Sequence, residues 1–172
     1  MYGRNKIMKK LEVFFDYSCP YCLKGHENLL QLLPEFPDVE VVWRPCEAHP
    51  RPERYGRHSD LCIMGMFYAQ NHGADIMKYH DIMYDACLKS RIDIEDLNLL
   101  ASFASALVNE AEFKDEIKSG MYTAQLNDAN SLAYDKSGVW AVPSYRMDGG
   151  KALDAVENVG VSKEDLRKFL EN

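Results

Sequence analysis

The sequence has no long apolar run, no block of basic residues and few cysteines. A helix that spans a bilayer needs about 20 apolar residues in a row, and the apolar runs here are much shorter. The formal net charge is -7, so nucleic acid is a poor expected partner. The start, MYGRNKIMKKLEVFF, lacks the apolar core and cleavage site of a secretory signal. We therefore expect a cytoplasmic protein without membrane or nucleic-acid partners.

Cysteine is scarce as well, and its pattern excludes two kinds of site. The five cysteines are Cys19, Cys22, Cys46, Cys62 and Cys87. A disulfide-stapled secreted domain has a dense and even set. A structural zinc site needs four ligands, usually from a second C-x-x-C or a close pair of histidines, and the sequence has neither. We expect no metal, and the single C-x-x-C needs another explanation.

The residues around this C-x-x-C predict a βαβ unit. Residues 11–15 are apolar and favour a strand, and a helix begins at Cys19 and Pro20 and stops at Pro34. Residues 39–43 favour a second strand. Two strands joined by one helix are parallel, with a right-handed crossover. The two cysteines therefore begin the first helix of this unit.

The middle of the chain, residues 59–137, has apolar residues at helical spacing. Ser59 is a candidate N-cap for the first helix of this block, and Gly73, Gly120 and Gly138 are candidate stops. We therefore expect a block of several helices between the second strand and the C-terminal part of the chain.

The C-terminal part predicts a β-hairpin and one more helix. Residues 144–147 and 152–156 flank the turn sequence Asp-Gly-Gly, and Ser162 caps the final helix. The order βαβ, helices, ββα predicts an α/β thioredoxin fold with a mixed central sheet and an all-helical insertion after the second strand.

This fold implies two parts within one chain. We expect residues 10–58 and 121–172 to form the thioredoxin-like domain, and residues 59–120 to form the helical insertion subdomain. No internal repeat or low-complexity segment interrupts this organisation.

The position of the C-x-x-C gives this weak motif its chemical meaning. A helix N-terminus carries unpaired N–H groups and about half a positive charge, and both favour a thiolate. The dipole is worth about 0.3–1 kcal/mol, or about 2 kcal/mol when partly buried, so we expect it to move the pKa of Cys19 by about one unit. Stronger acidity of Cys19 needs hydrogen bonds from the N–H groups of Tyr21 and Cys22. We expect Cys19 to be the exposed nucleophile and Cys22 the buried resolving thiol.

The segments FDYSCPYC and AVPSY resemble the thioredoxin superfamily and its DsbA-like branch. The segment VVWRPCEAHP is similar to the W-R-P-F-x-L-x-P segment of FrnE-type dithiol oxidoreductases, with Cys46 in place of the phenylalanine. The resemblance implies a protein-disulfide oxidoreductase that acts on protein or small-molecule thiols and disulfides without a bound cofactor. It also implies that Pro143 is cis and packs beside Cys19, and that the Val142 backbone pairs with a substrate strand.

Other residues near the motif have two readings each. Asp16 either relays a proton when Cys22 attacks or only holds the end of the strand by hydrogen bonds. Tyr21 and Pro20 are expected to contact substrate. His26 either tunes the thiol or is a core histidine with its hydrogen bonds satisfied. Cys46 either is an auxiliary thiol or fills the pocket of the replaced phenylalanine.

Two alternative functions stay open on the sequence. One is a glutathione-dependent transferase or isomerase of the kappa and chromene-carboxylate isomerase type, with glutathione as co-substrate; its members generally lack the second cysteine. The other is a non-catalytic binding or chaperone module. The sequence leaves open the direction of electron flow, the substrate and the oligomeric state.

Overall fold

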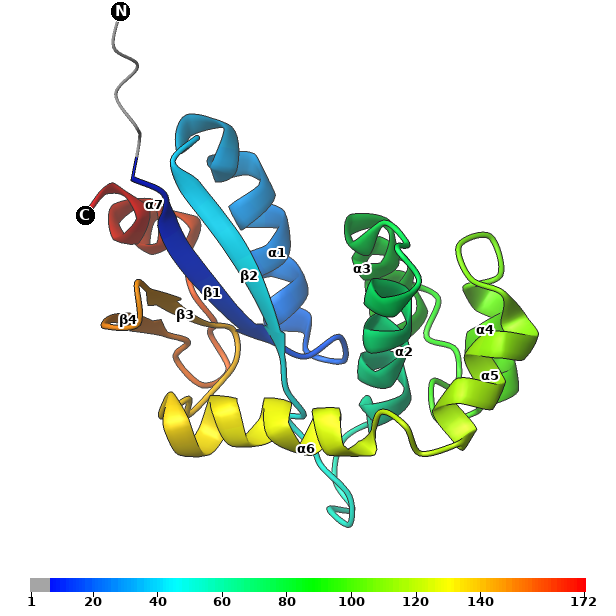
Figure 1. The fold of residues 1–172 in the computed structure, drawn as a ribbon. Helices are drawn as coiled ribbons and strands as arrows, with labels where there is room; N and C mark the ends of the chain where they lie inside the picture. Colours follow the sequence, from blue (N-terminus) through cyan, green and yellow to red (C-terminus); the bar gives the residue numbers. More distant parts are fainter. Residues whose placement is uncertain (1–6) are drawn as a thin grey trace, which may run out of the picture.

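The computed structural model describes residues 7–172, so most of the basic start of the chain lies outside the described residues. A four-stranded sheet forms the centre of the molecule (Figure 1). Its strands are β1 (Lys9–Phe15), β2 (Val39–Pro45), β3 (Ser144–Met147) and β4 (Lys151–Asp154). The order is β2-β1-β3-β4, with β1 and β2 parallel and the other two pairs antiparallel. The predicted mixed sheet is confirmed.

Seven α-helices lie within the described residues. They are α1 (Pro20–Leu32), α2 (Asp60–Asn71), α3 (Ile76–Tyr84), α4 (Leu97–Phe103), α5 (Glu110–Lys118), α6 (Thr123–Ser131) and α7 (Lys163–Glu171). In Figure 1, α1 and α7 lie behind the sheet, and α2 to α5 form a block to one side. The long yellow helix, α6, runs across the lower end of the strands. The α/β thioredoxin fold is confirmed, with helices inserted between β2 and β3.

The alternation of side chains along β1 explains the layers. Leu11, Val13 and Phe15 point into the main core, whereas Phe14 points to the other face. That second face is covered by a smaller cluster that includes Ala133. The segment Leu132–Lys136, which continues α6 as a π-helix, supplies this cover. Successive strand residues face opposite sides of a sheet, so both faces of β1 are buried.

Details at element ends differ from the sequence expectation at two places. Strand β4 ends at Asp154, and Val156 forms only an isolated bridge with Gly160. The Ser59 hydroxyl does not cap α2, because its backbone has φ -103° and ψ 9° instead of the extended conformation of a capping residue. Ser162 does cap α7 and accepts a hydrogen bond from the Asp165 N–H at 3.1 Å. The division at residue 120 into two parts stays a prediction.

The helical block packs tightly around Gly65 in α2. A Cβ at this position would lie 2.2 Å from the Tyr79 hydroxyl and 2.7 Å from the Phe113 ring. The Tyr79 hydroxyl also donates to the Cys62 carbonyl at 2.6 Å. Only a residue without a side chain lets α2 come this close to α3 and α5.

We expect Gly65→Ala to lower the free energy of unfolding by about 1–3 kcal/mol through overpacking, although alanine favours a helix more than glycine does. Urea denaturation followed by circular dichroism measures the change. Gly150→Ala is the matched control, because a Cβ there meets nothing within 4 Å. An equal effect of the two substitutions would contradict this account of the packing.

Candidate active site

The two cysteines of the C-x-x-C lie where β1 turns into α1. The Cys19 N–H donates to the Asp16 carbonyl at 3.1 Å, and the helix begins at Pro20 directly after it. The Cys19 side chain is half-buried and reaches the surface, whereas Cys22 is 1% exposed. This burial matches the roles expected for the two thiols.

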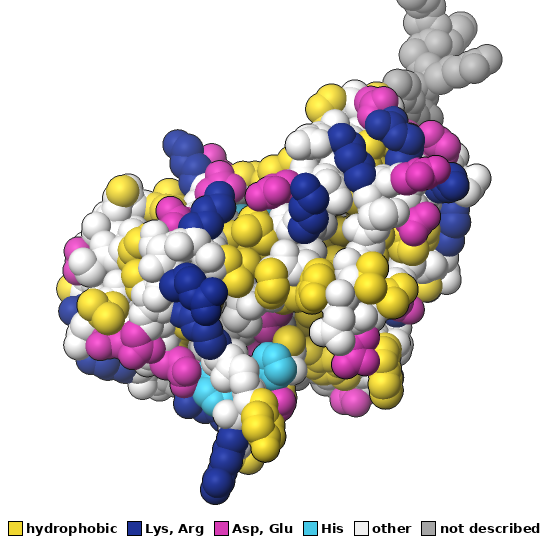
Figure 2. All heavy atoms as spheres, turned by 180° about the vertical axis from the view of Figure 1, so that it is seen from behind, with side chains coloured by type: hydrophobic (Ala, Val, Ile, Leu, Met, Phe, Trp, Pro, Cys, Tyr) yellow, Lys and Arg dark blue, Asp and Glu magenta, His cyan; other side chains and the backbone are white. Residues whose placement is uncertain are grey.

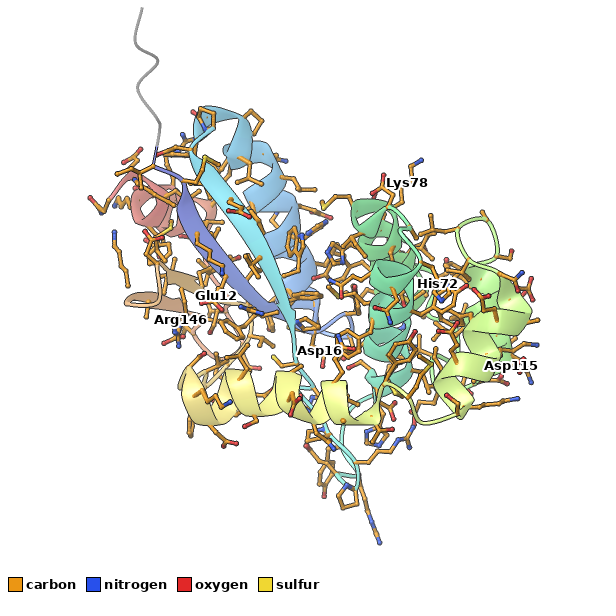
Figure 3. All side chains as sticks on the ribbon, in the orientation of Figure 1. Glu12, Asp16, His72, Lys78, Asp115 and Arg146 are labelled. Carbon is orange, nitrogen blue, oxygen red and sulfur yellow. The ribbon has the colours of Figure 1, made fainter. Side chains whose placement is uncertain are left out.

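Asp16 holds this turn through its carboxylate, at the lower end of β1 and beside α2 (Figure 3). It is fully buried. One carboxylate oxygen accepts hydrogen bonds from the N–H and the hydroxyl of Ser18 at 2.9 and 2.8 Å. The other oxygen accepts from the Ala48 N–H at 2.7 Å. The Asp16 backbone N–H, and not its carboxylate, donates to the Cys22 sulfur at 3.5 Å. The anchoring reading is therefore observed, and the proton relay stays a prediction.

The segment before β3 closes the other side of the site. The Val142–Pro143 peptide bond is cis, and the Cys19 thiol donates to the Val142 carbonyl at 3.7 Å. Within α1, a Cβ on Gly25 would lie 3.2 Å from the Pro143 ring and 2.7 Å from the Tyr145 hydroxyl. Gly25 thus lets β3 approach the helix. The sequence analysis missed it, although an isolated glycine inside a helical pattern is a signal for close packing.

The two thiols have environments that push their pKa values apart. A hydrogen bond from the Cys22 side chain lowers the pKa of Cys19, and the N–H groups of Cys22 and Tyr21 act in the same direction, against partial burial and the Asp16 charge. Burial raises the pKa of Cys22 well above its ordinary value, and the neighbouring Cys19 raises it further. When the pKa values of two neighbouring groups shift in opposite directions, the two groups can take different roles in a reaction.

A cavity of about 450 Å³ opens beside Cys19. Pro20, Tyr21 and Val142, the expected substrate contacts, all line it. Trp140 and Val156 line it too, and they are 86% and 63% exposed. Sequence analysis missed both, because their place beside Cys19 depends on how distant segments of the chain pack. The cavity is a recess next to the Cys19 thiol with a mainly apolar lining, and polar side chains such as His49 and Glu157 lie at its border.

A hydrogen-bonded clamp fixes the loop that borders this recess to α6. The Glu47 N–H donates to the Asn130 side chain at 2.8 Å, and the Asn130 amide donates back to the Glu47 carboxylate at 2.9 Å. The Tyr134 hydroxyl donates to the Glu47 carbonyl. Burial raises the pKa of Glu47. None of these contacts could be read from the sequence, since the partners lie more than 80 residues apart.

The structure decides between the two readings of Cys46 and corrects one reading of His26. Cys46 is fully buried in the apolar cluster with Phe14, and burial raises its pKa to about 12; it fills a core pocket. His26 is buried, but neither ring nitrogen has a hydrogen-bond partner among the described residues. Its Nε2 lies 3.9 Å from the Asp81 carboxylate, and burial lowers the pKa of His26. The expected core position of His26 is confirmed, because its ring packs against Trp43 and Tyr84, but the expected hydrogen bonds are not found among the described residues.

One cluster of metal-ligand side chains occurs within residues 7–172, between α2 and α5. His72 contacts Glu112 through one ring nitrogen at 3.2 Å and Glu116 through the other at 2.8 Å. Figure 3 places His72 on the side of α2 that faces α5, away from Asp16. Because each ring nitrogen contacts one carboxylate of α5, His72 connects the end of α2 to α5.

Residues 10–168 match the DsbA-like thioredoxin domain, which is nearly the whole chain. The chain belongs to this family. YwbO of Bacillus subtilis (strain 168), an uncharacterized protein, is 22% identical over 199 positions that cover 92% of this chain and 98% of YwbO.

Solved structures of DsbA proteins have the same fold as this DsbA-like chain. One is described as a probable DsbA oxidoreductase from Streptomyces coelicolor; it has a TM-score of 0.78 and 15% identity, covering 94% of this chain and 88% of that one. Pseudomonas aeruginosa DsbA has a TM-score of 0.70 and 19% identity, covering 99% and 84%. Within residues 7–172, no helix has the length and apolar character to cross a membrane.

We expect the thiol of Cys19 in the reduced protein to react with iodoacetamide at a lower pH than free cysteine does, because its pKa is lowered and the thiolate is the nucleophile. The pH profile of the alkylation rate, followed by mass spectrometry, measures this. Cys22→Ala removes the hydrogen bond that contributes most to the lowered pKa of Cys19, so the midpoint of its alkylation profile should move to higher pH. Cys22→Ser keeps a hydrogen-bond donor, so the midpoint should move less. An identical profile in Cys22→Ala would rule out the Cys22 hydrogen bond as the cause.

Proposed function

We propose that this protein is a dithiol–disulfide oxidoreductase in which Cys19 attacks and Cys22 resolves. The observation that carries the proposal is the pair of thiols at the start of α1, with pKa values shifted in opposite directions. The Cys19 sulfur also faces the Val142 carbonyl beside the cis-proline. An accessible thiolate with a resolving thiol three residues away is suited to exchange through a mixed disulfide.

The reaction has two steps that conserve sulfur bonds and electrons. The Cys19 thiolate attacks one sulfur of a substrate disulfide, a mixed disulfide forms, and the other substrate sulfur leaves as a thiolate that takes up a proton. Cys22 then loses its proton and attacks the Cys19 sulfur, which releases the second substrate thiol. Two electrons pass to the substrate, and the protein becomes a disulfide. The reverse sequence oxidises a substrate dithiol, and the reduction potential sets the direction.

The second step needs an acceptor for the Cys22 proton, because burial keeps that thiol protonated. We assign this role to the Asp16 carboxylate. Its charge acts on both sulfurs, since it raises the pKa of Cys19 and of Cys22. A carboxylate near a buried thiol can serve as a general base. The same carboxylate holds the turn, so it has a structural role in addition.

The recess beside Cys19 supports protein segments as substrates. Tyr21, Trp140 and Val156 present apolar surface next to the sulfur. Val142 lies before the first residue of β3 and supplies a backbone that an extended substrate can pair with, a mode in which the main chain gives affinity and side-chain pockets give specificity. We place the protein in the FrnE-type subfamily on its WRPCEAHP segment.

The two sulfurs carry the electrons in this proposal, so no bound cofactor is required, and glutathione is a possible small co-substrate. The cytoplasmic location stays a prediction. On the surface seen from behind in Figure 2, basic and acidic side chains are interspersed among hydrophobic ones, which fits a protein substrate better than a polyanion.

We expect Cys19→Ser to lower the rate of disulfide reduction in a peptide substrate by at least about 1,000-fold, because it removes the nucleophile. Cys22→Ser should accumulate a mixed disulfide at Cys19, visible by non-reducing mass spectrometry. Cys46→Ser is the control for loss of a buried cysteine, and its rate should stay within about twofold.

Two outcomes of this experiment would overturn the assignment. Full turnover of Cys22→Ser with glutathione would favour the glutathione-dependent transferase or isomerase. Absence of exchange in the wild-type protein with glutathione or any dithiol would favour a binding module.

We expect Trp140→Ala to raise KM for peptide disulfides with large apolar side chains by about tenfold, as for loss of one aromatic contact worth 1–2 kcal/mol. kcat should change little because neither step of the proposed exchange uses the indole. Tyr55→Ala is the matched control, since Tyr55 is 81% exposed and does not line the recess. Equal KM values for the two variants would show that Trp140 makes no substrate contact.

A further inference from the structure

A second pair of cysteines lies apart from the active site. Cys62 is in α2, and Cys87 is in the π-helix Asp85–Lys89 that follows α3. Their sulfur atoms are 3.8 Å apart, and both side chains are fully buried. By contrast, Cys46 makes no hydrogen bond to another cysteine within the part of the chain that the structure describes. The fold thus brings two thiols together that are 25 residues apart.

We propose that Cys62 and Cys87 form an intramolecular disulfide, which is a second redox site of this protein. The oxidant is a low-molecular-weight disulfide such as oxidised glutathione. One thiol attacks it as the thiolate, forming a mixed disulfide and releasing one glutathione thiol. The second thiol then displaces the other glutathione. One glutathione S–S bond breaks, one protein S–S bond forms, and the two thiol protons end on two molecules of glutathione.

The geometry favours this bond over reaction with outside thiols. A disulfide requires the sulfurs to move from 3.8 Å to about 2.05 Å, and rotation about each Cα–Cβ bond moves the sulfur without moving the helix. The backbone at each cysteine accepts a hydrogen bond from a side chain elsewhere in the chain. The Tyr79 hydroxyl donates to the Cys62 carbonyl at 2.6 Å, and the Arg57 guanidinium donates to the Cys87 carbonyl. Two thiols fixed in contact have a high effective concentration.

Burial makes the reaction slow but its product durable. The closed structure offers neither sulfur to glutathione, so oxidation proceeds through local opening. The π-helix around Cys87 is a candidate place for this opening, because its i→i+5 turn is a local departure from the regular helix. After closure the same burial protects the disulfide from reduction.

The bond would join α2 to the end of α3, next to the turn of the active site. Tyr17, which follows Asp16, packs edge-on against Tyr79 and Tyr84 with ring centroids 5.9 and 5.3 Å apart. These two tyrosines belong to α3, the helix that the disulfide would tie down. Oxidation would therefore fix the helices that lie against this turn.

The test uses the full chain with Cys19→Ser and Cys22→Ser, which leaves three cysteines and no active-site exchange. The protein is equilibrated with reduced and oxidised glutathione, quenched in acid, alkylated and mapped by mass spectrometry. We expect a linked pair of peptides containing Cys62 and Cys87, with Cys46 alone alkylated. The effective concentration of the pair should be about 30- to 800-fold higher in the native protein than in concentrated guanidinium chloride.

Three results would overturn the proposal: free thiols at both positions, separate glutathione adducts on them, or an effective concentration no higher in the native than in the unfolded chain. The control is the same protein with Cys87→Ser added. The thermal unfolding midpoint of the protein that keeps both cysteines should rise with the fraction of oxidised glutathione, whereas the midpoint of the control should not depend on it. If the Cys19→Ser and Cys22→Ser substitutions disturb folding, the free thiols of the wild-type protein are counted instead. Full oxidation should then leave one free thiol of the five cysteines. Because the proposal does not depend on Cys19 chemistry, its failure leaves the proposed function untouched.

Discussion

The hydrogen bond from the Asp16 N–H to the Cys22 sulfur lies at the point where strand, turn and helix meet. It requires Cys22 to be inside the first turn of α1, and the Asp16 carboxylate closes the same turn through Ser18 and Ala48. With Cys22 buried there, Cys19 must be one turn earlier, at the open end of the helix. The contrast between the two sulfurs thus follows from the burial of Cys22 and from the hydrogen bonds that Cys22 and Tyr21 make to Cys19.

The register of the central sheet brings the other half of the site into place. Phe14 pairs with Ser144 in the antiparallel ladder, so the Val142–Pro143 bond lies just beyond the end of β1, opposite the cysteines. A shift of one residue would exchange the two faces of β3 and remove Tyr145 from its contact with Gly25. Long-range pairing between residues over 120 positions apart therefore places the backbone that faces the Cys19 sulfur.

Sequence patterns were sufficient for the elements but not for their contacts. Strand β1, helix α1 and the capped helix α7 follow from short-range periodicity and from residues such as Pro20 and Ser162. The exposed Trp140 beside Cys19 and the contact of Cys62 with Cys87 depend on how distant segments pack. Periodicity indicates which face of a helix or strand is apolar, but it does not indicate which other element packs against that face. The sequence pattern likewise could not predict that His26 is buried without hydrogen-bond partners among the described residues.

The two cysteine pairs place the same chemistry in opposite environments. At the start of α1, one sulfur is accessible and its pKa is lowered, which favours fast exchange with many partners. Between α2 and the π-helix after α3, the hydrogen bond with Cys87 and burial raise the pKa of Cys62 well above its ordinary value, which slows attack by its thiol. Thiolate character and access set the rate of exchange, whereas the native arrangement sets its equilibrium. On the two proposals, one fold separates a pair that turns over from a pair that stores a covalent state.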